Sequence, residues 1–173
     1  MKLADYIRSI PDFPKEGIVF KDITTLLKDP AGLNMALNEF HKLCEFKKIT
    51  KVVGIESRGF IFGGALAARL GAGFVPIRKP GKLPAERLSK SYELEYGTDL
   101  IEIHKDALKP GDLVLMHDDL LATGGTMKAA CELVEELGAR IEQISFLIEL
   151  DFLRGRRLLD RYEVHSLIKY DAE

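Results

Sequence analysis

The chain has 173 residues, of which 46% are apolar and 30% are charged, and its formal net charge is −2. This length and composition are typical of about one globular domain, and the near-neutral charge argues against binding to nucleic acid or an anionic membrane surface. No apolar run approaches the roughly 18 residues of a membrane span, and the N-terminus has no signal-peptide core.

The N-terminal part is expected to form a small appendage on a single domain that covers residues 1–173. Residues 3–10 predict a short amphipathic helix, and the next segment, residues 11–17, is rich in turn formers. A longer helix is predicted from Pro30 to about residue 46, because Asp29 suits an N-cap and proline suits the first helical position.

The rest of the chain alternates strand and helix. Strands are predicted at residues 51–55, 74–77, 113–116 and 141–148, and helices at residues 60–70 and 127–137, ended by Gly71 and Gly138. This alternation predicts an α/β fold with a mainly parallel sheet, whose ligand lies beyond the carboxyl ends of the strands. Residues 82–98 are polar and weakly patterned, which predicts a long irregular segment of functional or mobile character.

Two cysteines, Cys44 and Cys131, lie alone in helix-like stretches. Isolated cysteines of this kind form neither a zinc site nor a disulfide framework. Both are therefore predicted to be reduced core residues of a cytosolic protein.

The most informative segment begins with the predicted strand at residues 113–116 and runs to residue 126. Two acids, Asp118 and Asp119, come soon after the strand and precede a turn of small residues that opens a helix. This turn, the glycine loop, consists of Ala122, Thr123, Gly124, Gly125 and Thr126. Glycines let main-chain N–H groups approach an anion, and a helix N-terminus adds free donors, so the loop is predicted to hold a phosphate. The carboxylates suit sugar hydroxyls or a Mg²⁺ ion bound to a sugar phosphate.

This string resembles the ribose-phosphate signature of type I phosphoribosyltransferases. Four further blocks resemble landmarks of the adenine phosphoribosyltransferase family in the family's order: residues 11–23, 56–60, 78–84 and 91–97. The resemblance covers nearly the whole chain. It implies the type I phosphoribosyltransferase fold, with residues 1–28 as an N-terminal hood that recognises the base and residues 82–98 as a mobile catalytic loop.

The resemblance also implies the reaction. Ribose 5-phosphate would pass from phosphoribosyl pyrophosphate (PRPP) to N9 of adenine, giving AMP and pyrophosphate. Mg²⁺ is implied as the cofactor, carried by PRPP and water and without direct protein ligands. A cytoplasmic homodimer is implied, with adenine and PRPP as small-molecule partners.

Roles for individual residues are implied by the same resemblance. Asp118 and Asp119 would bind the ribose hydroxyls, and the glycine loop would bind the 5′-phosphate. The implied pyrophosphate contacts are Ser57, Arg58, Arg78, Lys79 and Lys82, with a cis peptide bond between Glu56 and Ser57. The implied adenine contacts are Val19, Phe20, Lys21 and Leu120. Glu95 and Arg58 are the implied catalytic residues, Glu95 for a proton on the adenine ring.

Other interpretations remain open from the sequence alone. Phe20 is also compatible with plain core packing, and Glu95 with a solvated loop acid. His117 replaces the apolar residue that is usual in the family before the two acids, and no role is assigned to it. The alternatives to an adenine enzyme are a phosphoribosyltransferase for another base and a PRPP-sensing regulator that has lost catalysis.

Overall fold

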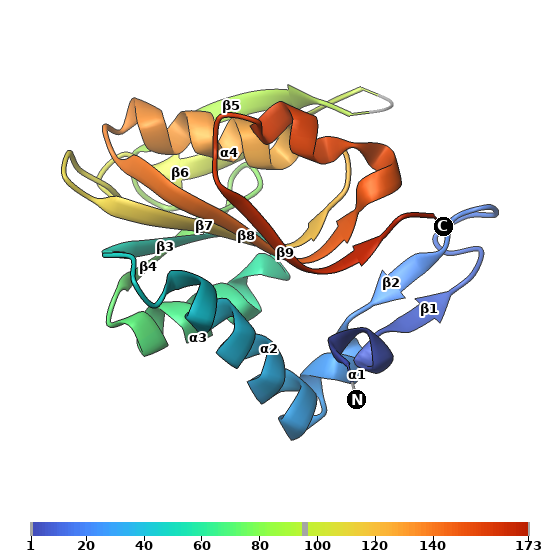
Figure 1. Cartoon of the computed structure of the whole chain (residues 1–173). Helices are drawn as coiled ribbons and strands as arrows, with labels where there is room; N and C mark the ends of the chain where they lie inside the picture. The colour runs from blue at the N-terminus through green and yellow to red at the C-terminus, as the bar shows by residue number, and fades with distance from the viewer. Residues whose placement is uncertain (1, 95–96, 173) are drawn as a thin grey trace.

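A five-stranded parallel sheet forms the centre of the computed structural model, which describes residues 2–94 and 97–172 (Figure 1). Its strand order is β4-β3-β7-β8-β9. The strands of the chain are β1 (Arg8–Ile10), β2 (Phe20–Asp22), β3 (Lys51–Ile55), β4 (Gly73–Ile77), β5 (Arg87–Glu93), β6 (Thr98–His104), β7 (Leu113–Leu121), β8 (Arg140–Leu150) and β9 (Val164–Tyr170). The helices are α1 (Thr24–Leu27), α2 (Pro30–Cys44), α3 (Gly59–Leu70) and α4 (Gly125–Glu136), with 3-10 turns η1 (Leu3–Tyr6), η2 (Asp151–Leu153) and η3 (Gly155–Leu159). The predicted α/β fold is confirmed.

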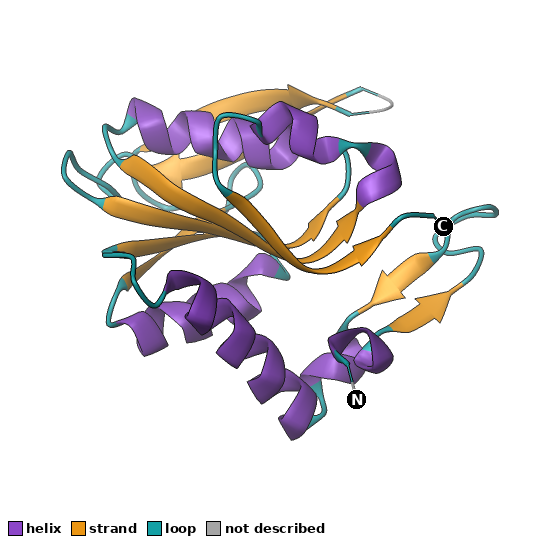
Figure 2. Ribbon diagram, in the orientation of Figure 1, coloured by secondary structure: helices purple, strands orange, loops and turns teal. Residues whose placement is uncertain are grey.

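Helices cover both faces of the central sheet (Figure 2). On one face α2 and α3 pack against residues such as Val52 of β3, and on the other α4 packs against the core that contains the next residue, Val53. Successive side chains of a strand point to opposite faces, so each buried strand supplies both cores. The antiparallel hairpin of β5 and β6 extends the second core, where Ile101 and Ile103 are buried beside α4.

The helix signals in the sequence are confirmed. The Asp29 carboxylate accepts hydrogen bonds from the N–H groups of Ala31 and Gly32, at 2.8 and 3.0 Å, and α2 begins at Pro30. Gly71 ends α3 in the left-handed conformation, with φ of 64°. That conformation is open to glycine at little cost, as a C-terminal cap requires.

Two predictions about local structure are wrong. Residues 3–10 form the short turn η1 followed by strand β1, because residues 8–10 pair with β2 rather than continuing a helix. Residues 82–98 are not irregular throughout, since β5 occupies much of them and pairs with β6 in full register. Leu88 and Tyr92 alternate with exposed residues along β5, a strand pattern that the polar residues between them obscure.

The strands β1 and β2 form a separate two-stranded sheet at the N-terminal end of the molecule (Figure 1). The buried carboxylate of Asp22 holds this sheet to α1. It accepts hydrogen bonds from Arg8 Nε at 3.0 Å and from the Thr24 N–H at 2.8 Å. Hydrogen bonds from Arg8 and Thr24 lower the pKa of Asp22 to about 2. Across the described residues, none of the helices is long and apolar enough to cross a membrane.

The cap at the start of α2 gives a test of local stability. Replacing Asp29 by Ala removes two hydrogen bonds from the first turn and should lower the free energy of unfolding by about 1 kcal/mol. Urea unfolding at pH 7 measures this change. Asp29→Asn keeps a capping oxygen and should retain most of the stability, so an equal loss in both variants would contradict the capping role.

Candidate active site

A cavity of about 210 Å³ lies at the carboxyl ends of β3 and β7, where the central sheet meets the β5–β6 hairpin. Its lining residues are Ile55, Glu56, Ser57, Arg58, Lys79, Tyr92, Ile101, Asp118, Asp119, Leu120 and Thr126. A second cavity of about 80 Å³ shares Asp118, Leu120 and Thr126 with it and continues along the glycine loop. The two cavities are therefore neighbours, and they lie where a parallel sheet is expected to bind its ligand.

Two adjacent carboxylates belong to this site: Asp118 lines both cavities, and Asp119 lines the larger one. Asp118 and Asp119 belong to β7, which runs beyond the predicted strand end at residue 116 and holds both backbones in the sheet. Asp119 is buried, donates its N–H to Asp118 Oδ1 at 2.8 Å, and lies 2.9 Å from Arg58 Nε through Oδ2. Arg58 therefore links the end of β3 to the acid pair of β7.

The acid pair carries raised pKa values. Burial raises the pKa of Asp118 well above its usual range, and the neighbouring Asp119 charge raises it further. Burial also raises the pKa of Asp119, although the Arg58 guanidinium opposes this. Burial and the neighbouring charge thus both disfavour the charged form of Asp118, and Arg58 is the cation that opposes the effect of burial on Asp119.

The glycine loop connects β7 to α4. Gly124 has φ of 85° and precedes the first helical residue, Gly125, and the next two residues of α4, Thr126 and Met127, line the smaller cavity. The lining of this cavity includes Ala122, Thr123, Gly124 and Thr126. Free N–H donors at a helix start favour an anion, which fits the predicted phosphate cradle.

The basic residues that follow β4 are held by acidic partners. Glu56 is an ion-pair partner of both Arg78 and Lys82, and it accepts a hydrogen bond from the Lys79 N–H at 2.9 Å. Burial acts to raise the pKa of Glu56, but the contacts with Lys82, Lys79 and Arg78 lower it to about 2. The peptide bond between Glu56 and Ser57 is cis, as the family resemblance implied.

Lys79 ties the hairpin to this end of the sheet. Its Nζ forms an ion pair with Asp99 of β6 and a hydrogen bond of 3.0 Å with the hydroxyl of Tyr92 in β5. The Tyr92 hydroxyl in turn donates to Asp99 Oδ2 at 3.0 Å. Burial acts to lower the pKa of Lys79, but its hydrogen bonds with Asp99 and Tyr92 raise that pKa and keep the ammonium charged.

The N-terminal hood reaches the site through one aromatic ring. Phe20 packs edge-on against Phe13, with ring centroids 5.2 Å apart, and the Arg58 guanidinium lies 5.4 Å from the Phe20 centroid. Lys21 is directed elsewhere, with its Nζ 4.4 Å from the Tyr170 ring and 3.2 Å from Ser9 Oγ. Any contact of Lys21 with a ligand in this site would therefore come from its main chain.

The predicted site residues fall into four groups in space. Those that line the larger cavity are Ser57, Arg58, Lys79, Asp118, Asp119, Leu120 and Thr126, and Ala122, Thr123 and Gly124 line the smaller one. Gly125 begins α4 and lines neither cavity. Arg78 and Lys82 meet at Glu56, at the edge of the larger cavity. Val19, Phe20 and Lys21 belong to the hood and line neither cavity. Glu95 lies outside the described residues.

Several residues of the site were not predicted from the sequence. Glu56, Tyr92 and Asp99 hold the cations in place, and Glu56 and Tyr92 lie within blocks already singled out by the resemblance. Their role as partners could not be predicted, because the pairs join segments 7 to 26 residues apart. A pairing between segments depends on the tertiary arrangement rather than on a local pattern.

His117 faces away from the acid pair into the core beneath α2 and α3. Its Nδ1 lies 3.0 Å from Ser145 Oγ, and its ring packs edge-on against Phe40, with centroids 5.0 Å apart. Burial lowers the pKa of His117 to about 3, so the ring is neutral at physiological pH. This residue contributes to packing and to the attachment of β7 to β8.

Comparisons with known proteins agree with this geometry. A family model described as a phosphoribosyl transferase domain matches residues 24–167. The curated adenine phosphoribosyltransferase of Halothermothrix orenii is 57% identical over 169 residues, which are 98% of this chain and 99% of that protein.

Solved structures extend the agreement to three dimensions. The adenine phosphoribosyltransferase of Thermoanaerobacter pseudethanolicus is 56% identical, with a TM-score of 0.94 and coverage of 97% of this chain and 98% of that one. The Saccharomyces cerevisiae enzyme, solved with D-2,5-dideoxy-2,5-imino-altritol 1,6-bisphosphate and adenine, is 44% identical with a TM-score of 0.90. It covers 95% of this chain, and 96% of its own length is matched.

The raised pKa of Asp118 gives a stability test with a defined sign. A carboxyl whose pKa is higher in the folded than in the unfolded state destabilises the fold as pH rises above the unfolded value of about 4. Asp118→Asn should therefore unfold at a higher urea concentration than the parent chain at pH 7, and the difference should close at about pH 4. Equal or lower stability of Asp118→Asn at pH 7 would contradict this account.

A matched control is Asp112→Asn. Asp112 is also buried, but its carboxylate accepts hydrogen bonds from the Lys109 N–H and the Thr50 hydroxyl, both at 3.0 Å. Its replacement removes acceptor capacity and should not stabilise the chain.

Proposed function

The chain belongs to the phosphoribosyltransferase family, and from this premise we propose that it is an adenine phosphoribosyltransferase. The observation that carries the proposal is a pair of neighbouring cavities that share Asp118: the larger is lined by cations and by Asp119, and the smaller lies at the start of a helix. The identity of 57% with a curated adenine enzyme over 98% of the chain supports the choice of base.

The proposed reaction is a displacement at C1′ of PRPP with inversion of configuration. The bond from C1′ to the pyrophosphate oxygen breaks, a bond from C1′ to N9 of adenine forms, and the N9 proton is released. The products are AMP and pyrophosphate. A transition state with oxocarbenium character requires a stabilised leaving polyanion and a fixed ribose.

The acid pair is assigned to the ribose. Hydroxyl groups at C2′ and C3′ can donate hydrogen bonds to Asp118 and Asp119. These bonds replace the hydrogen bonds with water that the two carboxylates lose in a sheltered site. Arg58 already holds Asp119 Oδ2 at 2.9 Å, so the acceptor atoms are fixed before the substrate arrives. The 5′-phosphate then occupies the smaller cavity against the N–H groups of the glycine loop.

Pyrophosphate is assigned to the cations at the other end of the site. Arg58, Lys79 and Ser57 line the larger cavity directly. Arg78 and Lys82 lie beside it, because both form ion pairs with Glu56, which lines the cavity. A guanidinium can grip phosphate oxygens bidentately, which favours Arg58 as the direct stabiliser of the leaving group. Its position between Asp119 and Phe20 supports further contacts with the regions assigned to the ribose and to adenine.

Mg²⁺ fits the donor set of this site. Carboxylate oxygens are available at the acid pair, while no group of three or more potential metal-binding acids, histidines or cysteines occurs in the described residues. Mg²⁺ commonly keeps several waters and binds through one or two carboxylates together with substrate phosphates. When bound, it would neutralise charge on the pyrophosphate, with Asp118 and Asp119 as the residues that hold its water shell.

Adenine is assigned to the space between the hood and β7. Phe20 and Leu120 would enclose the ring, and main-chain groups of Val19 and Lys21 would read its edge. The Lys21 ammonium points toward Tyr170, which supports main-chain readout at this position. Glu95 is assigned to the proton on the adenine ring, within a loop that closes over the site and excludes water.

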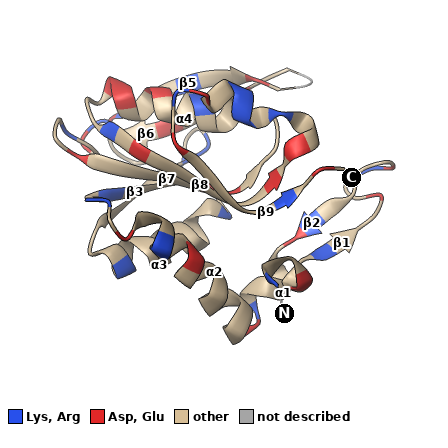
Figure 3. Ribbon diagram, viewed as in Figure 1, with Lys and Arg blue, Asp and Glu red and all other residues tan. Residues whose placement is uncertain are grey.

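We also propose a cytoplasmic homodimer. Both cysteines are free and buried, as in a reducing compartment. Exposed large apolar side chains among the described residues include Phe46, Ile61 and Leu158, which supports a buried contact between two copies. Acidic and basic positions are interspersed along the ribbon (Figure 3), in keeping with small-molecule rather than nucleic-acid partners.

Product analysis tests the proposed function. The purified chain with Mg²⁺ and PRPP should form AMP from adenine, and no nucleotide from guanine, hypoxanthine, xanthine or orotate in separate tubes. EDTA should abolish the product, and Asp118→Asn with Asp119→Asn should reduce turnover by at least about 100-fold. A different nucleotide would overturn the assignment of the base, and PRPP binding without any product would favour a regulator.

The assignment of Glu95 has its own test. Glu95→Gln should lower kcat by about 100-fold, because a positioned acid or base is lost, and should leave PRPP binding unchanged. Glu93→Gln is the matched control, since Glu93 is an exposed acid two residues earlier in the sequence, at the end of β5, and its kcat should stay at the parent value. Equal activity in both variants would remove Glu95 from the mechanism.

A further inference from the structure

The C-terminal turn η3 lies against the glycine loop, although about 30 residues of chain separate them. Gly155 is buried at this contact. A Cβ at Gly155 would overlap the carbonyl oxygen of Ala122 and lie 2.8 Å from the carbonyl carbon of Thr123. A Cβ at Gly124 would likewise lie 3.1 Å from the carbonyl carbon of Gly155. The two backbones are therefore in direct contact with no side chain between them.

The backbone conformation does not require glycine at position 155. Gly124 has φ of 85°, but Gly155 is not among the residues with positive φ, so an alanine there would suffer no conformational strain. A side chain at position 155 is excluded only because the glycine loop lies so close. Glycine is therefore required here by the position of the loop and not by the backbone conformation of residue 155.

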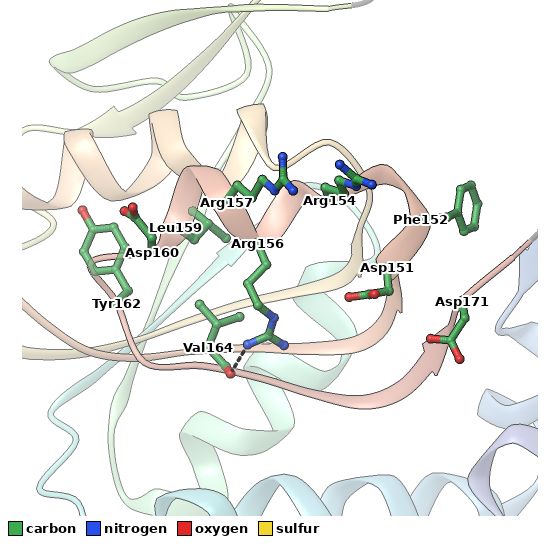
Figure 4. Close-up of a pocket in the computed structure, with 10 residues that line it drawn as sticks. All are labelled: Asp151, Phe152, Arg154, Arg156, Arg157, Leu159, Asp160, Tyr162, Val164 and Asp171. Carbon is green, nitrogen blue, oxygen red and sulfur yellow. Dashed lines mark hydrogen bonds between the residues drawn. The ribbon is translucent and has the colours of Figure 1, made fainter.

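An ion pair fixes Gly155 to the central sheet. The next residue, Arg156, donates to both carboxylate oxygens of Glu149 on β8, through Nε at 2.9 Å and Nη2 at 2.5 Å. Its Nη1 also donates to the Val164 carbonyl at 2.7 Å, where β9 begins, as Figure 4 shows. The Glu149 side chain is only 2% exposed, and two parallel hydrogen bonds fix the orientation of the Arg156 guanidinium on it.

We propose that Gly155, held by the Arg156–Glu149 pair, is a positioning residue that sets the shape of the glycine loop for the 5′-phosphate. The inference rests on the proposed function, which places that phosphate in the loop. Main-chain N–H groups can stabilise a phosphate only if their directions converge, and a displacement of about 1 Å is enough to lose much of that effect. Gly155 lines neither of the two cavities and acts only on the backbone of the loop.

Gly155→Ala is the direct test. The added methyl must displace either the 3-10 segment or the glycine loop, so KM for PRPP should rise by about tenfold or more. KM for adenine should change by less than about twofold, because the hood is not in contact with Gly155. Gly64→Ala is the matched control, since a Cβ at Gly64 meets nothing within 4 Å, and both KM values should stay at the parent level.

Arg156→Lys tests the same inference without adding volume, and it decides the question where Gly155→Ala does not fold. Lysine keeps the charge but loses the bidentate contact with Glu149, so KM for PRPP should rise by about three- to tenfold. Arg157→Lys is the control, because no partner of the Arg157 side chain occurs among the described residues. The inference is overturned if both test variants keep the parental KM for PRPP, or if KM for PRPP and adenine rise together.

Binding of ribose 5-phosphate separates this inference from the proposed function. Calorimetry with ribose 5-phosphate should show weaker binding to Gly155→Ala than to the parent chain and Gly64→Ala. If the parent chain makes no AMP but this difference persists, the proposed function fails and the inference stands. If AMP is made and the three chains bind ribose 5-phosphate equally, the inference fails alone.

Discussion

The ion pair between Arg58 and Asp119 is the contact on which the arrangement of the site depends. It joins the end of β3 to the end of β7, and the same guanidinium lies over the Phe20 ring of the hood. Burying Asp119 beside Asp118 is unfavourable without a cation, and Arg58 supplies one from a neighbouring strand. Because parallel strands end at one edge, a single arginine can contact the regions assigned to the ribose, the leaving group and the base.

The same balance of charge extends through the rest of the site. Glu56 forms ion pairs with two cations and accepts a hydrogen bond from a main-chain N–H, and Asp99 forms an ion pair with Lys79. The basic residues near the cavity therefore have acidic partners before any ligand binds. These pairs hold the cations in position at low conformational cost. A polyanion that binds these cations must compete with the internal carboxylates, which lowers its affinity; under the proposed function this favours release of pyrophosphate.

The sequence predicted those features whose causes are local. Asp29 and Pro30 start a helix, Gly71 ends one, and apolar runs bounded by glycine form the buried strands, because each depends on residues within one turn or one strand. The acid pair and glycine loop were predictable for the same reason. Strand β1 was not, since residues 8–10 adopt it only by pairing with residues 20–22, and its length of three residues carries no period. Strand β5 was obscured by polar residues on its exposed face.

Gly155 shows why part of a site escapes prediction from a single sequence. A glycine within Arg154-Gly155-Arg156 is typical of an ordinary surface turn, and nothing in that string refers to residues 122–126. Only the fold brings the two main chains together, with Glu149 and Arg156 fixing the distance between them. The residues that bind a ligand carry chemistry visible in their side chains, whereas Gly155 contributes by having none. The space available at Gly155 is set by the position of the glycine loop, and the distance between two segments so far apart in the sequence is determined by the tertiary structure.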